Sequence, residues 1–243
     1  MASTSDLQEQ ALTFYKNKSN ALTPSQNTLS LITHDSSNFP SWLIAGILQQ
    51  SVSTNNECFL SPNFPSINKE SSPSYVYSFT NTIQTYNKYF LKYNIKNNKN
   101  LHFTSFINSD APPLASWYTS IISEIKSNRN PVVIIENPEL VLLLDPTVTI
   151  NKLLSQIQEI QKHCALYIVS TTSTSSSFTS TYLPSILHRS SLIISLTALT
   201  TGRADDISGT LTISTGPIPN ENQIESRQYS YLISNSAVKL YFK

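Results

Sequence analysis

The carboxylate best placed for chemistry closes an apolar run. Glu136 directly follows Val132–Ile135, a continuous β-branched run that predicts a strand buried on both faces. An acid at the end of such a strand can hold magnesium or orient an attacking water, provided that a phosphate is bound beside it. Many buried strands end in a carboxylate, so we favour a structural role for Glu136 where no phosphate cradle accompanies it.

The turn that follows the first predicted strand lacks the residues of a phosphate cradle. A phosphate-binding loop needs glycines whose amides point inward, a lysine for the terminal phosphates and a hydroxyl for magnesium. The turn His34–Ser41 contains neither glycine nor lysine, although Ser41 offers a hydroxyl. Asp35 would repel a phosphate, and Pro40 has no amide proton to donate. We therefore expect no bound cofactor and no catalytic residue in this chain.

Histidine and cysteine are too dispersed to predict a metal site. The four histidines form no i, i+4 pair and have no cysteine at metal-ligand spacing: His34, His102, His163 and His188. His163 precedes Cys164, and such a pair suits nucleophilic catalysis. The pair lies between a predicted helix and a predicted buried strand, where cysteine usually packs as a small hydrophobe. We predict no metal ion and interpret Cys164 as a core residue.

A lysine-rich helix is the first candidate nucleic-acid surface. Three lysines repeat every four residues and a fourth follows: Lys88, Lys92, Lys96 and Lys99. No acidic residue lies between Glu70 and Asp110. At 100° per residue, these lysines fall opposite an apolar stripe that we expect to be core: Ile83, Tyr86, Phe90 and Tyr93. Because a charged face opposite an apolar stripe is typical of any surface helix, the solvated face is favoured and nucleic-acid contact is the alternative.

Arg203 marks the second candidate surface. It lies in the hydrophilic segment Thr200–Asp206, from which its guanidinium could reach a phosphate. Asp205 and Asp206 weaken the local positive field, and an Arg–Asp pair within the loop is the alternative interpretation. The candidate nucleic-acid-binding residues are therefore Arg203, Lys88, Lys92 and Lys96.

These residues are positioned by apolar runs that alternate between strand and helix patterns. Strands are predicted over Leu29–Thr33, Tyr75–Phe79, Leu101–Ile107, Val132–Ile135, Ala165–Val169 and Leu192–Leu196. Helical spacing follows Pro40 and recurs in stripes that start at Ile83, Leu114 and Ile150. This alternation favours βαβ units and a parallel sheet. Leu211 and Ile213, and then a hairpin over 229–242, alternate as antiparallel strands do.

The expected architecture is a single α/β domain over residues 1–243. Its mainly parallel central sheet is flanked by helices and extended by antiparallel strands at the C-terminal end. The proline-containing stretch 51–74 and the Ser/Thr-rich stretch 170–181 are predicted to be exposed, mobile loops.

Composition excludes several classes of protein. Charged residues make up 13% of the 243 residues and the formal net charge is +1, which argues against a polybasic nucleic-acid coat. No apolar run approaches the ~18 residues needed to cross a bilayer, and Met1–Gln10 shows no signal-peptide pattern. Cys58 and Cys164 stand far apart, so no disulfide framework is predicted and a reducing compartment, cytosol or nucleus, is expected.

Four segments resemble, in the same order, the fungal Elongator complex protein 6 family: Leu29–His34, Val132–Leu140, Leu199–Gly216 and Tyr229–Lys243. The third segment and the closing Val238–Lys243 are the most specific. The resemblance implies a RecA-like fold that lacks the ordinary phosphate-binding loop. It also implies a heterohexameric ring with Elongator proteins 4 and 5, docked on the catalytic Elongator subunits that modify the wobble uridine of certain tRNAs. The family's ring binds tRNA with an affinity that responds to ATP.

On this resemblance, the chain is expected to be a non-catalytic subunit that acts by assembly and tRNA binding in the cytoplasm and also in the nucleus. Its low surface charge suits two flanks buried against neighbours, because few charges must lose their water. Two alternatives stay open. One is a RecA-like NTPase with an unorthodox site that uses Glu136, and the other is a stand-alone nucleic-acid binder that uses the lysine-rich helix.

Overall fold

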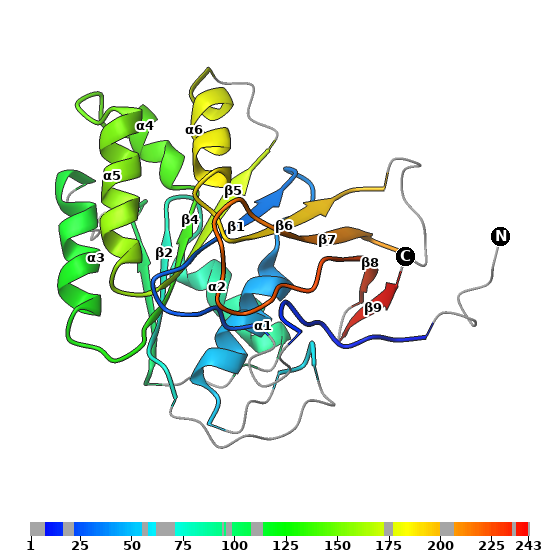
Figure 1. Cartoon of the computed structure of the whole chain (residues 1–243). Helices are drawn as coiled ribbons and strands as arrows, with labels where there is room; N and C mark the ends of the chain where they lie inside the picture. Colours follow the sequence, from blue (N-terminus) through cyan, green and yellow to red (C-terminus); the bar gives the residue numbers. More distant parts are fainter. Residues whose placement is uncertain are drawn as a thin grey trace.

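A computed structural model shows a mixed α/β domain built on one large sheet (Figure 1). The structure describes residues 8–16, 22–54, 58–61, 71–93, 95, 99–107, 114–172, 177–199, 207–234 and 237–242. The strands are β1 (Leu29–His34), β2 (Ser74–Ser78), β3 (Leu101–Ser105), β4 (Val132–Glu136), β5 (Ala165–Thr171), β6 (Leu192–Thr197), β7 (Gly209–Thr215), β8 (Arg227–Ile233) and β9 (Val238–Phe242). The helices are α1 (Ser41–Val52), α2 (Ile83–Lys92), α3 (Trp117–Ile125), α4 (Val141–Leu144), α5 (Ile150–Gln161) and α6 (Ser177–Leu187), with 3₁₀ turns η3 (Leu114–Ser116) and η4 (Pro138–Leu140).

The strand order across the sheet is β3-β2-β4-β5-β1-β6-β7-β8-β9. The first six strands in this order run parallel, and β7, β8 and β9 continue the sheet in antiparallel fashion. The expected mainly parallel sheet with flanking helices and a C-terminal antiparallel extension is therefore confirmed. The strands β1, β2, β4 and most of β5 are buried along their length because helices cover both faces there.

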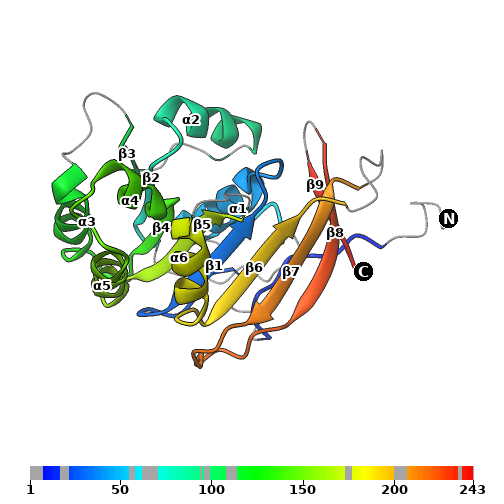
Figure 2. The same ribbon diagram turned by 90° about the horizontal axis from the view of Figure 1, so that it is seen from above.

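Two hydrophobic cores lie on opposite faces of the sheet. Helices α1 and α2 cover one face, and α3, α5 and α6 cover the other (Figure 2). In the first core, the ring of Trp42 on α1 contacts Tyr231 of β8 at a centroid distance of 5.2 Å. In the second core, Trp117 at the start of α3 meets Phe79 edge-on at 5.7 Å. These aromatic pairs join the helices to the sheet on both sides.

The N-terminal segment 8–16 runs along the end of the sheet that β9 forms. Glu9 makes an isolated antiparallel β-bridge with Tyr241 of β9, and the amide of Gln10 donates to the carbonyl of Leu240 at 2.8 Å. Further along, Tyr15 bridges Ile224 in an antiparallel pairing. This segment therefore occupies part of the outer edge of β9, which would otherwise present unpaired backbone groups.

Helix α6 is the main element that the sequence pattern did not predict. Of the predicted loop 170–181, Ser170 and Thr171 complete β5 and residues 177–181 begin α6, while 173–176 lie outside the described residues. Tyr182 and Ile186, one turn apart, are both fully buried and anchor the helix on the second core. These two apolar residues are too few to give a recognisable helical pattern among the serine and threonine residues around them. Pro184 within the helix weakens the pattern further.

The proline-containing stretch 51–74 is described only in part. Ser51 and Val52 end α1, and Ser74 begins β2, whereas 55–57 and 62–70 lie outside the described residues. Among the helices that the described residues form, none is long and apolar enough to cross a membrane.

Candidate functional site

The parallel strands bring polar residues together at one edge of the sheet. Ser78, Glu136, Thr171 and His34 are the last residues of β2, β4, β5 and β1, which lie side by side. We call these strand ends, with the loops that follow them, the polar edge. In an open parallel sheet, ligands bind outside the carboxyl ends of the strands, so the polar edge is the first place to look for a site.

Glu136 is the centre of a saturated hydrogen-bond network. Its side chain is fully buried, and one carboxylate oxygen accepts from the hydroxyls of Ser78 at 2.6 Å and Tyr86 at 3.2 Å. The other oxygen accepts from Thr80 and from the amide nitrogen of Asn81. Burial raises the pKa of Glu136, although all four donors act in the opposite direction. Two donors on each oxygen use the full acceptor capacity of a carboxylate, so Glu136 fastens β2 and α2 to β4.

The turn after β1 is closed by its own aspartate. One carboxylate oxygen of Asp35 accepts from the amide of Ser37 at 3.1 Å and from its hydroxyl at 2.6 Å. The other oxygen accepts from the amide of Ala198 at 2.7 Å and from Asn38 at 3.3 Å. Burial acts to raise the pKa of Asp35, but the accepted hydrogen bonds outweigh it and the pKa is lowered. An internal anion thus occupies these amides and ties the turn to the segment after β6.

His34 is held as a neutral ring beside Thr171. Its Nδ1 lies 2.7 Å from the carbonyl of Asp35, which can only accept, so Nδ1 carries the proton and Nε2 is free to accept from the Thr171 hydroxyl at 3.3 Å. Burial lowers the pKa of His34, although the carbonyl and carboxylate of Asp35 oppose this shift. Phe39 packs edge-on against the ring at 5.6 Å. The histidine therefore serves the polar edge as a neutral hydrogen-bonding group.

Glu139 is a second buried carboxyl at the polar edge. It lies in η4, which begins after Asn137 adopts a left-handed backbone conformation with φ of 50°. The hydroxyl of Ser170 donates to it at 3.1 Å. Burial raises the pKa of Glu139 to about 7, partly opposed by hydrogen bonds that include Ser170. Near neutral pH this carboxyl is half protonated, which lowers the cost of burying it.

The polar edge is therefore built to hold loops together. Its carboxylates, hydroxyls and imidazole contact one another, and no cluster of three or more potential metal ligands occurs within the described residues. Glu136, which the sequence placed beside a hypothetical phosphate, faces neutral donors from its own chain. Cys164 is likewise internal: its Sγ donates to the carbonyl of Ile160 at 3.2 Å, and burial raises the pKa of its thiol.

The candidate nucleic-acid residues are only partly described. Lys88 and Lys92 are exposed on α2, and the Nζ of Lys92 lies 5.4 Å from the ring centre of Tyr93. Lys96 and Arg203 lie outside the described residues. Elsewhere, Lys162, Arg189, Arg227 and Lys239 make their hydrogen bonds or ion pairs with residues that lie outside the polar edge.

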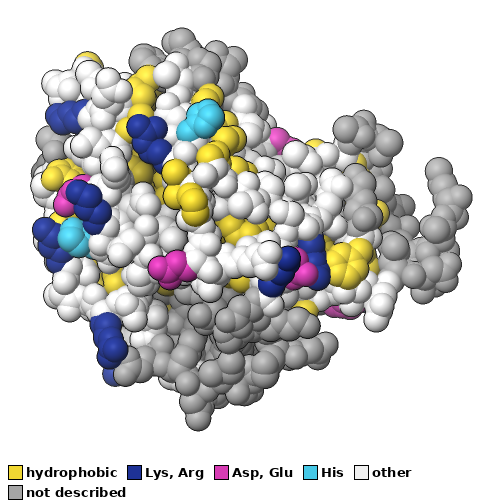
Figure 3. All heavy atoms as spheres, in the orientation of Figure 1, with side chains coloured by type: hydrophobic (Ala, Val, Ile, Leu, Met, Phe, Trp, Pro, Cys, Tyr) yellow, Lys and Arg dark blue, Asp and Glu magenta, His cyan; other side chains and the backbone are white. Residues whose placement is uncertain are grey.

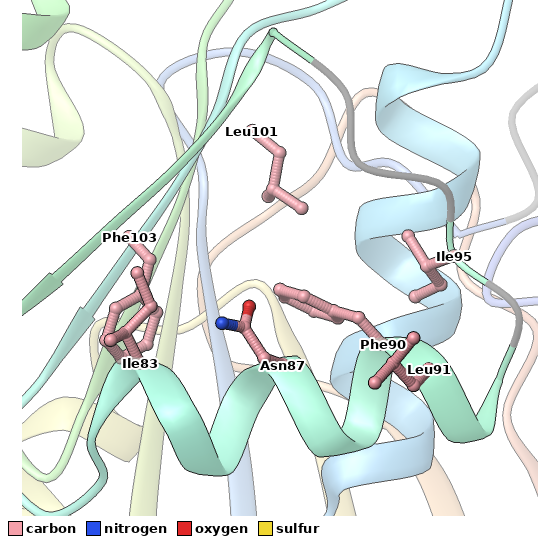
Figure 4. A pocket seen from close by; sticks show the side chains of 7 residues that line it. All are labelled: Ile83, Asn87, Phe90, Leu91, Ile95, Leu101 and Phe103. Atoms are coloured by element: carbon pink, nitrogen blue, oxygen red, sulfur yellow. The ribbon is translucent and has the colours of Figure 1, made fainter.

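The apolar stripe of α2 differs from the expectation of a buried core face. Tyr86 and Tyr93 are buried, but Ile83 is 41% exposed and Phe90 is only half-buried. Ile83 and Phe90 line an open groove of about 450 Å³ between α2 and β3, which we call the α2–β3 groove (Figure 4). Its lining residues are Ile83, Asn87, Phe90, Leu91, Ile95, Leu101 and Phe103. The sequence could not reveal this groove, because the pattern does not show that β3 ends the sheet.

Comparison of the chain with models of protein families and with curated proteins gives no match.

The buried carboxyl of Glu139 should make stability depend on pH. Its pKa is about 7 in the folded chain against an ordinary value of 4.5, so folding takes up a proton between these values. The contribution of Glu139 to stability is therefore greatest below pH 4.5 and falls as the pH rises through 7. We expect the unfolding free energy of the natural chain, relative to that of Glu139→Gln, to drop by roughly 1–3 kcal/mol from pH 5 to pH 8.

Urea denaturation of both proteins at the two pH values measures this difference. The exposed Glu221→Gln is the matched control and should track the natural chain at both pH values. Identical pH dependence in the natural chain and Glu139→Gln would show that Glu139 does not hold its proton in the fold.

Proposed function

We propose that this chain is a non-catalytic RecA-like subunit of the heterohexameric accessory ring of Elongator. In this role it assembles with Elongator proteins 4 and 5, docks with them on the catalytic Elongator subunits, and supports tRNA wobble-uridine modification by assembly and tRNA binding. The observation that carries the proposal is the turn after β1, where the carboxylate of Asp35 accepts from the amide of Ser37 in the same turn and from the amide of Ala198, which follows β6.

The sheet supports the RecA-like part of the proposal. In such domains the first strand lies inside a mainly parallel sheet, and antiparallel strands extend one end. Here β1 lies between β5 and β6, and β7 to β9 form the antiparallel extension. The arrangement places the turn after β1 at the ligand-binding end of the sheet, where a RecA-like NTPase would hold its phosphates.

The segments that resemble the Elongator family coincide with defining parts of this fold. Leu29–His34 is β1, and Val132–Leu140 covers β4 with Glu136 and continues through η4. Tyr229–Lys243 contains most of β8 and all of β9. The resemblance therefore falls on the polar edge and on the antiparallel extension, both of which shape the surface of the domain.

The antiparallel extension offers a flank with few charges. On β6, β7 and β8 the side chains opposite the first core are uncharged, and hydroxyl residues predominate among them: Ile193, Ser195, Thr197, Thr210, Thr212, Ser214, Gln228, Ser230 and Leu232. The extension projects beyond α3, α5 and α6 (Figure 1), and in the same orientation charged side chains form a few small groups on a largely uncharged surface (Figure 3). A neighbour can cover such a flank at a small desolvation cost, as a ring subunit requires.

The polar edge supports a role without catalysis by this chain alone. Glu136 is fully buried and accepts hydrogen bonds from four side chains, so it has no free oxygen lone pair for a magnesium ion or a water. The turn after β1 already holds one negative charge, the carboxylate of Asp35. A triphosphate at this turn would meet the charge of Asp35 at amides that are already hydrogen-bonded. The two cysteines, Cys58 and Cys164, are buried and are not joined in a disulfide, in keeping with the proposed cytoplasmic and nuclear locations.

Assembly provides the direct test. When this chain is co-expressed with Elongator proteins 4 and 5, we expect a stable complex whose mass, measured by native mass spectrometry, corresponds to two copies of each protein. Each protein pair without the third should fail to give this mass. A chain that stays monomeric in the presence of both partners would contradict the proposal.

The assembled ring should bind tRNA partly through the four sequence-predicted residues. We expect Arg203→Ala, and separately the triple alanine variant of Lys88, Lys92 and Lys96, to weaken tRNA binding without altering the mass of the ring. Each phosphate contact that is lost should also reduce the slope of log affinity against log salt by about 0.7–0.9.

Fluorescence anisotropy with labelled tRNA at several salt concentrations measures both quantities. Lys152→Ala on α5 is the control, because Lys152 is exposed and lies on the opposite side of the sheet from α2. Unchanged affinity and an unchanged salt slope for both test variants would assign tRNA binding to other residues.

A substitution at Glu136 separates the proposal from the NTPase alternative. Glu136→Gln places an amide nitrogen against hydroxyl and amide donors, so we expect it to lower the unfolding free energy by about 1–3 kcal/mol. We expect no magnesium-dependent nucleotide turnover by the isolated natural chain, and therefore no loss of turnover in Glu136→Gln. Robust turnover by the natural chain that disappears in a folded Glu136→Gln variant would favour the enzyme.

A further inference from the structure

One end of the sheet carries a strand edge that no described segment covers. β3 is the terminal strand at this end, whereas the opposite terminal strand, β9, is bridged by the N-terminal segment at Glu9. Natural proteins usually blunt or cover the edges of their sheets, so an open edge beside an apolar groove deserves a functional explanation.

The hydrogen-bond register shows which backbone groups of β3 face outward. The amide of Ser74 donates to the carbonyl of Asn100, and the amide of Phe106 donates to the carbonyl of Ser78. In a parallel ladder, bonding residues alternate along each strand, so the even-numbered residues of β3 bond to β2. The amides and carbonyls of Leu101, Phe103 and Ser105 therefore point away from β2. Leu101 and Phe103 are partly exposed and could pair with an added strand, whereas Ser105 is buried.

The α2–β3 groove lies beside these outward-facing groups. The side chains of Leu101 and Phe103 point from β3 into the groove, and α2 forms its opposite wall (Figure 4). Leu91 on that wall is 81% exposed, and Asn87 supplies a single polar side chain among the lining residues. An extended segment that pairs with β3 would place every second side chain on the groove side of the sheet.

Charge indicates what kind of segment fits. Two lysines near the groove are exposed: Lys88 lies on α2, and Lys99 lies just before β3. No acidic residue occurs in the sequence between Glu70 and Asp110. Carboxylates on the incoming segment would meet these cations, whereas β3 of a second copy would bring lysines against lysines. The complementary occupant is therefore an extended segment of a different protein, with apolar side chains and neighbouring acidic residues.

We propose that β3 and the α2–β3 groove bind such an acidic, apolar segment of a partner protein by strand addition. The segment pairs with the outward backbone groups of Leu101 and Phe103, places alternate apolar side chains in the groove, and directs its carboxylates to Lys88 and Lys99. This inference does not depend on the proposed ring, since it rests on the edge, the groove and the lysines alone.

Two synthetic peptides test the proposal with the full chain. Their sequences are Glu-Glu-Leu-Thr-Val-Thr-Val-Ser and the reverse order, so that parallel and antiparallel pairing are both sampled. Each peptide is labelled with a fluorophore, and its binding is followed by fluorescence anisotropy. We expect one of them to bind saturably with a Kd on the order of 10–100 μM, and to bind about tenfold more weakly when lysines replace its glutamates.

Leu91→Asp is the decisive variant, because it removes an apolar contact and adds a repelling carboxylate at a position that is 81% exposed. We expect it to weaken peptide binding at least about tenfold while the thermal unfolding midpoint stays unchanged. Leu143→Asp is the matched control: Leu143 is 56% exposed on α4, away from the groove, and its substitution should leave peptide affinity unchanged.

Backbone methylation distinguishes strand addition from simple apolar contact. In an added strand, only alternate residues direct their amides to β3, so N-methylation of one alternating set should abolish binding and of the other set should preserve it. Failure of both peptides to bind, equal affinities for Leu91→Asp and Leu143→Asp, or indifference to both methylated sets would overturn the proposal. It would also be overturned if a short single-stranded RNA bound in a Leu91-dependent manner and the peptides did not, since the groove would then belong to nucleic acid.

Discussion

The architecture depends on burying the carboxylate of Glu136 with its hydrogen-bond capacity filled. A buried ionisable group without partners would cost far more than the fold can supply, and here Ser78 and Tyr86 meet one oxygen while Thr80 and Asn81 meet the other. These donors come from the end of β2, from the loop that follows it and from α2. This side chain therefore ties α2 to the sheet beside the α2–β3 groove, together with the packing of Tyr86 against Phe103.

Asp35 plays a comparable part at the other side of the polar edge. Its carboxylate joins the turn after β1 to the amide of Ala198, so two loops from neighbouring strands share one anion. The helix that follows, α1, starts after Pro40, and Asp35 fixes the short connection that leads into it. Asp35 and Glu136 thus each hold the loops beside them with a carboxylate of the chain itself, so no bound anion is needed to order these loops.

Much of the fold could be predicted from hydrophobic periodicity. The run Val132–Ile135 and the stripe that begins at Ile150 match β4 and α5, because long, regular patterns leave few alternatives. Helix α6 could not be predicted, because its two buried residues, Tyr182 and Ile186, are too few to form an apolar stripe among serines and threonines. At the polar edge, the sequence pointed to Glu136 and to the unsuitable turn, but it could not show that Asp35 binds Ala198, a contact across 163 residues. The exposure of Ile83 was equally hidden, because it depends on β3 being the last strand of the sheet.

The unequal ends of the sheet have a consequence for solubility. The segment around Glu9 and Gln10 lies along β9. A second copy whose β9 paired with β3 of the first copy would therefore have to displace this segment. Growth by edge-to-edge stacking, which leads to fibres, requires both borders of the sheet to be open. Partial coverage of β9 therefore leaves β3 as the more open border of the sheet without offering an equally open second border for continued stacking.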